Sequence, residues 1–343
     1  MKVLVTGGAG LVGSHSAEYY AKAGCEVIAF DNLMRSRLFG SDKKTVEYNW
    51  NYLKQYKNIT RVVGDVRNEA DLERVVPGVD LVIHTAGQPG VPLSVRIPKE
   101  DFSINAYGTL SVLEALRQKS PKATFIYCST NKVYGENVDQ YVLEEKEKRY
   151  IYKDIKGIAE GLSIDHCGHT PYGASKYVGD LYVQEYAHIY GMRTAVFRMS
   201  CIYGTRQFGF EDQGWVAWFV IASLLNKPIT IYGNGKQVRD LLYVDDLVQA
   251  YDAFARSDLK HGVFNTGGGA ANTISLLEFI ELLENQRGCK MKATFSDWRP
   301  SDQKVYISDI TKINQKLHWQ PKTSVSEGLK LLIKWAEENR DLF

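Results

Sequence analysis

The strongest constraint on the fold is a regular alternation of short apolar runs and amphipathic stretches in the first 200 residues. The apolar runs, which we predict to be strands, occur at 2–6, 26–30, 60–65, 80–86, 124–130 and 194–199. Helical patterns lie between or beside them at 13–23, 70–76, 106–118 and 175–190. Near-continuous valine- and isoleucine-rich runs that alternate with helices indicate a parallel sheet buried on both faces. The sequence therefore predicts an α/β fold with a doubly wound parallel sheet.

The pattern changes after Tyr203, where glycines, aromatic residues and turn signals become more frequent. We therefore predict a first domain at 1–200, with a later segment near 235–265, and a smaller second lobe at 201–343. The last helix is predicted near 325–339. The charged stretch 143–157 is predicted to be a solvated insertion, and a lid is the alternative.

Composition excludes several classes of protein. The 343 residues carry a net charge of 42 − 40 = +2, which does not favour a nucleic-acid partner. Five scattered cysteines without Cys-x-x-Cys spacing argue against a metal site or disulfides and suit a reducing cytoplasm. The apolar run 215–225 has about half of the ~20 residues that a membrane span needs, so a buried helix is expected. The chain starts directly in a strand, with no room for a signal peptide, and we predict a cytoplasmic protein.

A glycine-rich turn joins the first predicted strand to the first helix. The segment TGGAGLVGSH spaces Gly7, Gly10 and Gly13 so that the backbone can approach a pyrophosphate at the positive end of the helix. Asp31 ends the second strand about 20 residues later, where an acid can bind the ribose 2′-hydroxyl of a dinucleotide. These features predict a Rossmann sheet that binds a nicotinamide cofactor.

Asp31 favours NAD over NADP because a carboxylate repels a 2′-phosphate. Arg35 and Arg37 leave NADP open, since either could pair with such a phosphate. The residues predicted to contact the cofactor are Gly7, Gly10, Leu11, Val12, Gly13, Asp31, Asn32, Asp65, Val66, Ala86 and Lys176.

A tyrosine, a lysine and a threonine form the predicted catalytic group. Tyr172 and Lys176 are four residues apart in a predicted helix, so their side chains share one face. A free phenol has a pKa near ~10, and a neighbouring ammonium together with the positive ring of an oxidised nicotinamide would favour the phenolate. Thr130, at the end of a predicted strand, could hydrogen-bond the substrate hydroxyl that is deprotonated. This arrangement suits acid–base catalysis of hydride transfer.

These motifs resemble those of the extended short-chain dehydrogenase/reductases that modify nucleotide sugars. The resemblance rests on TGGAGLVG, Asp31, HTAGQ at 84–88, STNKVYG at 129–135 and the Tyr-x-x-x-Lys pair, and it covers essentially the whole chain. Sugar 4,6-dehydratases of this branch carry an Asp-Glu pair where this chain has Asn131-Lys132, and they use it to expel water. Simple 4-epimerases usually have small residues there.

The set STNKVYG, RQFGFEDQGW at 206–215, GNGKQVRD at 233–240 and RPSDQ at 299–303 is most similar to the CDP-paratose/CDP-tyvelose 2-epimerases. The resemblance implies epimerisation at carbon 2 of a CDP-linked hexose through a transient ketone. It also implies a homodimer, or a tetramer, paired through helices near 106–118 and 175–190. The alternatives are epimerisation at carbon 4, 4,6-dehydration and a non-catalytic NAD-sensing protein.

A nucleotide sugar carries a diphosphate, which planar guanidinium groups bind well. Arg239 in QVRD and Arg299 in RPSDQ match the diphosphate-binding arginines of the family. The residues predicted to bind substrate are Gln88, Thr130, Arg206, Gln207, Gln213, Tyr232, Arg239 and Arg299. Tyr232 is expected near the base or ribose, and the two glutamines Gln88 and Gln213 near the sugar.

Overall fold

The computed structural model describes residues 1–39, 43–299 and 302–343. The chain divides into two compact units, each made of three segments. Unit 1 comprises 1–130, 171–198 and 248–264, and unit 2 comprises 131–170, 199–247 and 265–343.

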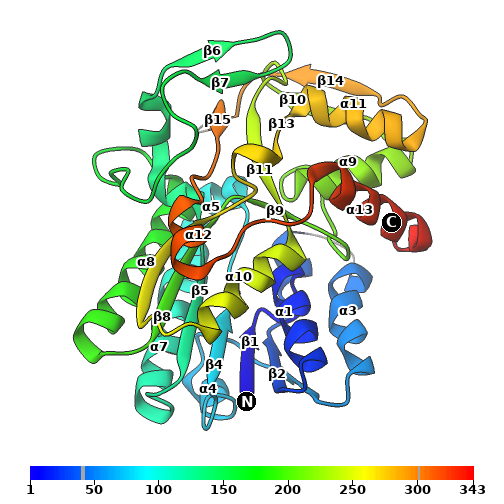
Figure 1. Ribbon diagram of the computed structural model, residues 1–343. Coiled ribbons are helices and arrows are strands. Elements are labelled where there is room, and N and C mark those ends of the chain that lie inside the picture. Colours follow the sequence, from blue (N-terminus) through cyan, green and yellow to red (C-terminus); the bar gives the residue numbers. More distant parts are fainter. Residues whose placement is uncertain (40–42, 300–301) are drawn as a thin grey trace. The chain divides into compact units, whose positions relative to one another are not determined.

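Unit 1 is built on a seven-stranded sheet in the order β12-β8-β5-β4-β1-β2-β3 (Figure 1). The strands are β1 (Lys2–Thr6), β2 (Glu26–Asp31), β3 (Ile59–Val63), β4 (Leu81–His84), β5 (Thr124–Thr130), β8 (Thr194–Met199) and β12 (His261–Thr266). The pairs β1–β2, β1–β4, β2–β3 and β4–β5 are parallel. The predicted α/β Rossmann sheet is therefore confirmed.

The helices of unit 1 form two groups beside this sheet (Figure 1). They are α1 (Leu11–Lys22), α2 (Arg35–Phe39), α3 (Lys43–Tyr52), α4 (Glu69–Glu73), α5 (Val91–Arg96), α6 (Pro98–Phe102), α7 (Gly108–Lys119), α8 (Thr170–Tyr190) and α10 (Val244–Arg256), with shorter turns at η1 (Leu53–Gln55) and η2 (Ser103–Tyr107). The Tyr186 hydroxyl of α8 donates to Glu114 of α7 at 2.5 Å. The Tyr19 hydroxyl of α1 donates to Asp252 of α10 at 2.9 Å. Because both faces of the strands are buried, the chain needs the nearly continuous apolar runs seen in the sequence.

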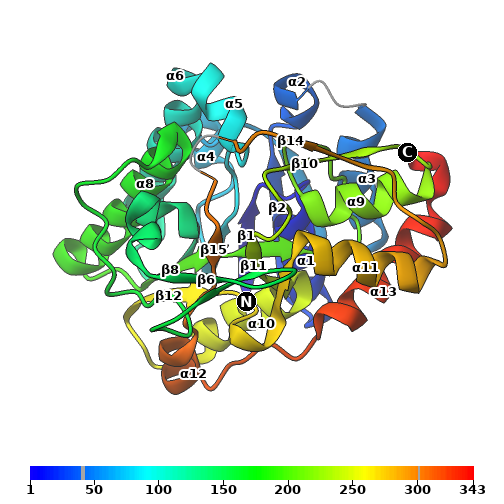
Figure 2. The ribbon, with the colours of Figure 1, turned by 90° about the horizontal axis from the view of Figure 1, so that it is seen from above.

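Unit 2 packs three helices around a second apolar core, and Figure 2 shows α9, α11 and α13 side by side. Its elements are η3 (Asn131–Gln140), β6 (Leu143–Glu145), β7 (Tyr150–Tyr152), β9 (Cys201–Tyr203), α9 (Trp215–Leu224), β10 (Ile229–Tyr232), β11 (Val238–Tyr243), η4 (Ala270–Asn272), β13 (Thr273–Ser275), α11 (Leu276–Arg287), β14 (Ala293–Ser296), β15 (Val305–Tyr306), α12 (Thr311–Leu317), α13 (Val325–Glu338) and η5 (Arg340–Leu342). The apolar run that raised the question of a membrane span is the buried helix α9. Among the described residues, no helix combines the length and apolar character that crossing a bilayer requires.

Residues 131–170 group with unit 2, which differs from the predicted boundary at residue 200. The charged stretch within them contains the hairpin β6–β7, whose tyrosines attach it to unit 2. Tyr150 accepts a hydrogen bond from Asn234 at 2.7 Å, and its backbone N–H donates to Lys236 at 3.0 Å. The Tyr152 hydroxyl donates to the carbonyl of Val305 at 2.8 Å. These hydrogen bonds attach the hairpin to the rest of unit 2, although most of its charged side chains are exposed to solvent.

Candidate active site

The glycine turn between β1 and α1 is tightly folded. Gly7 has a φ of +72°, and the N–H of Gly10 donates to its carbonyl at 2.9 Å. A Cβ on Gly13 would lie 2.1 Å from the same carbonyl oxygen, so only glycine fits there. The first turn of α1 contains no acidic residue. The N–H groups at the start of this helix are thus suited to an anionic phosphate.

Asp31 is fixed at the end of β2 by the backbone. Its carboxylate accepts hydrogen bonds from the N–H groups of Ala9 at 2.9 Å and Leu33 at 2.7 Å. Burial raises the pKa of Asp31, and the two backbone hydrogen bonds oppose that rise. The glycine turn and this fixed acid fit the pyrophosphate and ribose of NAD. Leu11 and Val12 begin α1 in the same region, and Ala86 follows β4, where its N–H contacts the hydroxyl of Thr6 at 3.3 Å.

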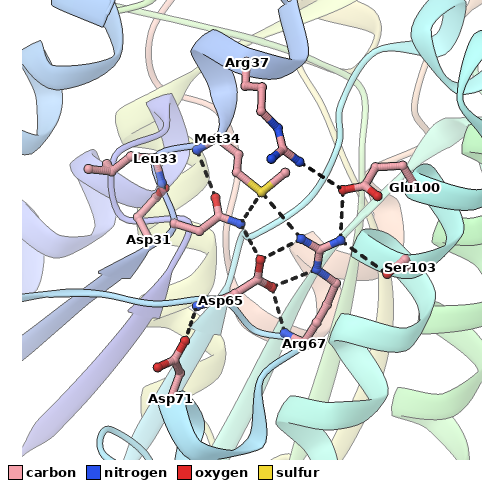
Figure 3. Close-up of polar contacts among 10 residues, drawn as sticks. Asp31, Leu33, Met34, Arg37, Asp65, Arg67, Asp71, Glu100 and Ser103 are labelled. Atoms are coloured by element: carbon pink, nitrogen blue, oxygen red, sulfur yellow. Dashed lines mark hydrogen bonds and ion pairs between the residues drawn. The ribbon is translucent and has the colours of Figure 1, made fainter.

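A charged network follows β3, around Asp65, one of the predicted cofactor contacts (Figure 3). The Asp65 carboxylate accepts two side-chain hydrogen bonds from Arg67, at 2.9 and 2.7 Å, and one from Asn32 at 2.9 Å. Burial acts to raise the pKa of Asp65, but these bonds lower it to about 2. Arg67 also binds Glu100 at 2.9 Å. Arg67 was not predicted as a site residue, although its position two residues after Asp65 was visible in the sequence.

The two arginines that left NADP open lie near different acids. Arg37 is largely exposed and is 4.0 Å from Glu100. Arg35 is half-buried, and desolvation lowers its pKa to about 10, while the charge of Asp31 opposes this shift. Arg35 therefore lies close enough to Asp31 for the two opposite charges to interact.

The predicted catalytic residues come together inside unit 1. Thr130 ends β5, and α8 begins at Thr170 and carries Tyr172 and Lys176 one turn apart. Burial raises the pKa of Tyr172 to about 12, a hydrogen bond with the Thr130 side chain lowers it, and the charge of Asp101 raises it further. The protein's own groups thus favour the neutral phenol. The positive ring of an oxidised nicotinamide would act in the opposite direction.

Lys176 is also buried, and burial lowers its pKa to about 8. Its ammonium lies over the ring of Tyr127, 4.3 Å from the ring centroid. The backbone N–H of Tyr172 donates to the hydroxyl of Ser94 at 3.1 Å, which fixes the start of α8. The tyrosine and lysine are therefore held on a rigid helix, as their spacing predicted.

A buried polar network lies beside this group and was not predicted. Asp101 accepts hydrogen bonds from Gln88 at 2.8 Å, from Ser175 at 2.5 Å and from Asn105 at 3.1 Å. Gln88, a predicted sugar contact, is fully buried, and its amide also bonds with Gly90. Its contact with the sugar stays a prediction. No spacing in the sequence signals this network, because its members come from α6, η2, α8 and the loop after β4.

In unit 2, the predicted diphosphate arginine Arg239 is already paired with an acid. Its guanidinium donates to Asp302 at 2.7 Å and to the carbonyl of Val238 at 2.8 Å. Burial lowers the pKa of Lys132 to about 8, Arg239 adds to this effect, and Asp302 opposes it. Lys132 therefore belongs to the same charged cluster. Residues 300 and 301 of the RPSDQ motif lie outside the described residues.

The second predicted arginine forms a separate cluster. Arg299 donates to Asp212 at 3.0 Å and lies 3.8 Å from the centroid of the Tyr232 ring. The Tyr232 hydroxyl donates to Glu211 at 2.8 Å. The remaining predicted residues lie nearby in sequence: Arg206 and Gln207 are buried, and Gln213 pairs with Phe210 through two backbone hydrogen bonds. The acidic partners of both arginines were not predicted.

The fold, the glycine turn and the tyrosine–lysine pair of α8 define a Rossmann protein built for NAD-linked chemistry. The model of the NAD dependent epimerase/dehydratase family matches residues 3–267. The chain belongs to this family, and its cofactor is NAD.

Three relatives illustrate the similarity. The chain is 42% identical to CDP-paratose 2-epimerase of Salmonella typhi, over 98% of this chain and 99% of the relative. It is similar to the crystal structure of UDP-glucose 4-epimerase with UDP-glucose from Thermotoga maritima, with a TM-score of 0.83, 31% identity and coverage of 99% and 100% of the two chains. UDP-glucuronic acid 4-epimerase from Bacillus cereus, in complex with UDP-glucuronic acid and NAD, gives a TM-score of 0.83, 27% identity and the same coverage.

Proposed function

We propose that this chain inverts carbon 2 of a CDP-linked hexose, as in the conversion of CDP-paratose to CDP-tyvelose. One observation carries the proposal: Thr130 is hydrogen-bonded to the half-buried Tyr172, and the residues after it are Asn131 and Lys132 rather than an acid pair. Oxidation and re-reduction of one carbon needs a base and a hydroxyl partner, whereas expelling water needs an acid. The full-length similarity to CDP-paratose 2-epimerase supports the choice of carbon 2 and of cytidine.

The side chains of unit 1 have separate tasks in this reaction. When bound at the glycine turn and Asp31, NAD would supply the hydride-transfer chemistry at carbon 2. Tyr172 accepts the proton of the 2-hydroxyl, so loss of hydride from the same carbon leaves a ketone. Thr130 holds the substrate oxygen, and the charge of Lys176 stabilises the phenolate and binds the nicotinamide ribose. After the ketone presents its other face, Tyr172 returns the proton, and the net consumption of NAD is zero.

The predicted substrate contacts in unit 2 would hold the diphosphate during this turn of the sugar. Arg239 and Arg299 are the best candidates, since guanidinium groups make paired hydrogen bonds to phosphate oxygens. Arg206, Gln207, Gln213 and Tyr232 are proposed as further contacts to the nucleotide or sugar, and Gln88 as a contact to the sugar.

The test is proton NMR in deuterated water, with purified protein and no added cofactor. CDP-, UDP- and GDP-hexoses are offered, including CDP-paratose and CDP-tyvelose. We expect inversion at carbon 2 of the CDP-sugars without solvent deuterium in the product, because the hydride returns from a tightly held cofactor. Inversion at carbon 4 would keep the chemistry and refute the specificity. A 4-keto-6-deoxy product would indicate dehydration. No turnover, with NAD bound, would favour the NAD-sensing alternative.

We also propose that the protein is a cytoplasmic homodimer formed through α7 and α8. Helix α8 exposes four large apolar or aromatic side chains: Leu181, Tyr182, Ile189 and Tyr190. An exposed apolar patch on a helix is typical of a protein interface. Light scattering after size exclusion should give the mass of a dimer for the wild type and of a monomer for Ile189→Lys. A dimer in both would exclude this face, and Lys334→Glu on α13 provides the control charge change.

A further inference from the structure

The ring of Tyr127 lies directly against the ammonium of Lys176. Tyr127 is on β5 and is completely buried. The Lys176 Nζ is 4.3 Å from its ring centroid, well within the ~6 Å over which an aromatic face attracts a cation. In the part of the chain that the structure describes, no carboxylate forms an ion pair with Lys176. The ring is therefore the group that this buried charge meets at close range.

The phenol of Tyr127 is fixed to the same helix by a second contact. Its hydroxyl donates to the backbone carbonyl of Lys176 at 3.1 Å. Gly179, one turn further along α8, leaves space for this hydroxyl, because a Cβ there would lie 2.4 Å from its oxygen. The ring thus contacts the side chain of the lysine while its hydroxyl holds the main chain. Tyr127 therefore contacts Lys176 twice, through its ring at the ammonium and through its hydroxyl at the backbone carbonyl.

A neutral histidine supports the ring. The rings of His84 and Tyr127 are nearly parallel, with centroids 5.9 Å apart and an angle of 19°. His84 also hydrogen-bonds the hydroxyls of Thr6 at 2.7 Å and Thr109 at 3.1 Å. Burial lowers the pKa of His84 to about 3, and the charge of Lys176 adds to the effect. The imidazole therefore carries no charge that would repel the ammonium.

We propose that Tyr127 is a positioning residue for Lys176, holding the ammonium against a neutral aromatic face in place of a carboxylate. This inference rests on the proposed catalytic role of Lys176. A carboxylate at this distance would neutralise the ammonium and disfavour the phenolate of Tyr172. The ring attracts the cation without adding a negative charge, so the positive charge stays available to Tyr172 and to the cofactor ribose.

The other groups that act on Lys176 come from three elements. Burial lowers its pKa, whereas Cys128 on β5, Asp101 on α6 and Asp180 on α8 act to raise it. Asp180 is already paired with Arg198 at 2.9 Å, and Asp101 is occupied by three hydrogen-bond donors. These carboxylates are thus committed to other partners, which leaves the close contact with the ammonium to Tyr127.

The experiment measures the pKa of Lys176 in the NAD-bound protein, by NMR of 15N-labelled lysine side chains across pH, with Lys176→Met to assign the signal. Tyr127→Leu removes the aromatic face, and Tyr127→Phe keeps it. Phe125→Leu is the control, because Phe125 is an equally buried ring on the same strand. We expect the pKa of Lys176 to fall by about one unit in Tyr127→Leu, and to stay at the wild-type value in the other two.

Two results would overturn the proposal: an unchanged pKa of Lys176 in Tyr127→Leu, or an equal shift in Phe125→Leu. If Tyr127→Leu does not fold, Gly179→Ala displaces the whole Tyr127 side chain instead, because a Cβ there would lie 2.4 Å from the hydroxyl oxygen and 2.8 Å from the ring carbon that carries it. A fall of the Lys176 pKa is expected there too, because the ring moves away from the ammonium. This measurement needs no sugar, so it is independent of the proposed substrate. A shifted Lys176 pKa without turnover of any CDP-hexose would refute the proposed substrate and leave the role of Tyr127 standing. Turnover of a CDP-hexose with an unshifted Lys176 pKa would refute the role of Tyr127 and leave the proposed substrate standing.

Discussion

The two units hold their functional charges in opposite ways. In unit 1, Asp31 is fixed by backbone N–H groups, and Lys176 is in contact with an aromatic ring. In unit 2, Arg239 and Arg299 are each paired with an aspartate. The first arrangement fixes the charge in place through backbone N–H groups or an aromatic ring. The second neutralises the charge with a carboxylate that a phosphate would have to replace.

This difference suggests that the charged groups of unit 1 serve the chemical step and the arginines of unit 2 serve substrate binding. The groups of unit 1 need no exchange of partners before they act, so their substitution should affect the chemical step. If the arginines of unit 2 bind the diphosphate, as proposed, they must leave their acidic partners to do so, and their substitution should affect substrate binding. Substitutions of Tyr172, Arg239 and Asp65 test this division.

The largest effect is expected for Tyr172→Phe. Removing a general base typically costs 10²- to 10⁴-fold in rate, so turnover of the CDP-sugar should fall by about 10³-fold. The bound NAD should remain, because the ring still fills its position. Turnover is measured by NMR and NAD by absorbance after denaturation. Tyr182→Phe, an exposed tyrosine on the same helix, is the control. Turnover within a few-fold of the wild type would remove Tyr172 from the mechanism.

A smaller effect, on binding alone, is expected for Arg239→Ala. A lost hydrogen bond to a charged group is worth about 1.5–3 kcal/mol, so KM should rise about 10- to 100-fold while kcat changes little. Initial rates over a range of CDP-sugar concentrations measure both constants. Lys148→Ala is the control, because it removes an exposed ion pair of the same unit, with Glu281 at 2.8 Å. A fall in kcat at unchanged KM would contradict the division between the units.

The smallest effect is a pH-dependent loss of stability in Asp65→Asn. The pKa of Asp65 is lowered to about 2 from its ordinary 3.8. Its stabilisation is therefore present above pH 3.8 and is lost as the pH falls through about 2. After allowance for partial exposure, we expect Asp65→Asn to reduce the free energy of unfolding by about 1–2 kcal/mol at pH 7.

Urea unfolding at pH 7 and at low pH measures this effect. The wild type and Asp65→Asn should converge as the pH approaches about 2. Glu73→Gln, which disrupts only an exposed contact with Lys119 at 3.9 Å, should change the stability by less than about 0.5 kcal/mol. A constant difference between Asp65→Asn and the wild type over the whole pH range would show that charge is not the cause.

Most of the fold could be predicted because unit 1 repeats a simple pattern. The predicted strands 2–6, 124–130 and 194–199 have the same bounds as β1, β5 and β8. Strand β12 was not predicted. Its sequence is HGVFNT, of which only the last three residues are buried, so it lacks a continuous apolar run. The grouping of 131–170 was missed for another reason. It depends on Tyr150 and Tyr152 in a charged stretch, whose hydrogen-bond partners, Asn234 and Val305, lie far along the chain.

The same distinction applies to the site. The glycine turn, Asp31 and the pair Tyr172–Lys176 follow fixed local spacings, so sequence alone could find them. Tyr127 looked like any apolar residue of a strand, since its contact with Lys176 joins positions 49 residues apart. Asp302 looked like a surface acid, although it pairs with Arg239, 63 residues away. Contacts between distant positions leave no spacing to recognise.

The division of each unit into three segments has a consequence for synthesis on the ribosome. All three predicted catalytic residues have been made once the chain reaches residue 176, but unit 1 needs its last segment, 248–264. Until β12 emerges, β8 lacks the partner that completes the edge of the sheet. Translation proceeds from the N-terminus, so the first two segments of unit 2, 131–170 and 199–247, are made before unit 1 is complete, and unit 2 still lacks its last segment, 265–343. The predicted catalytic residues are thus synthesised well before the unit that contains them is complete. No contiguous gene fragment encodes unit 1 by itself.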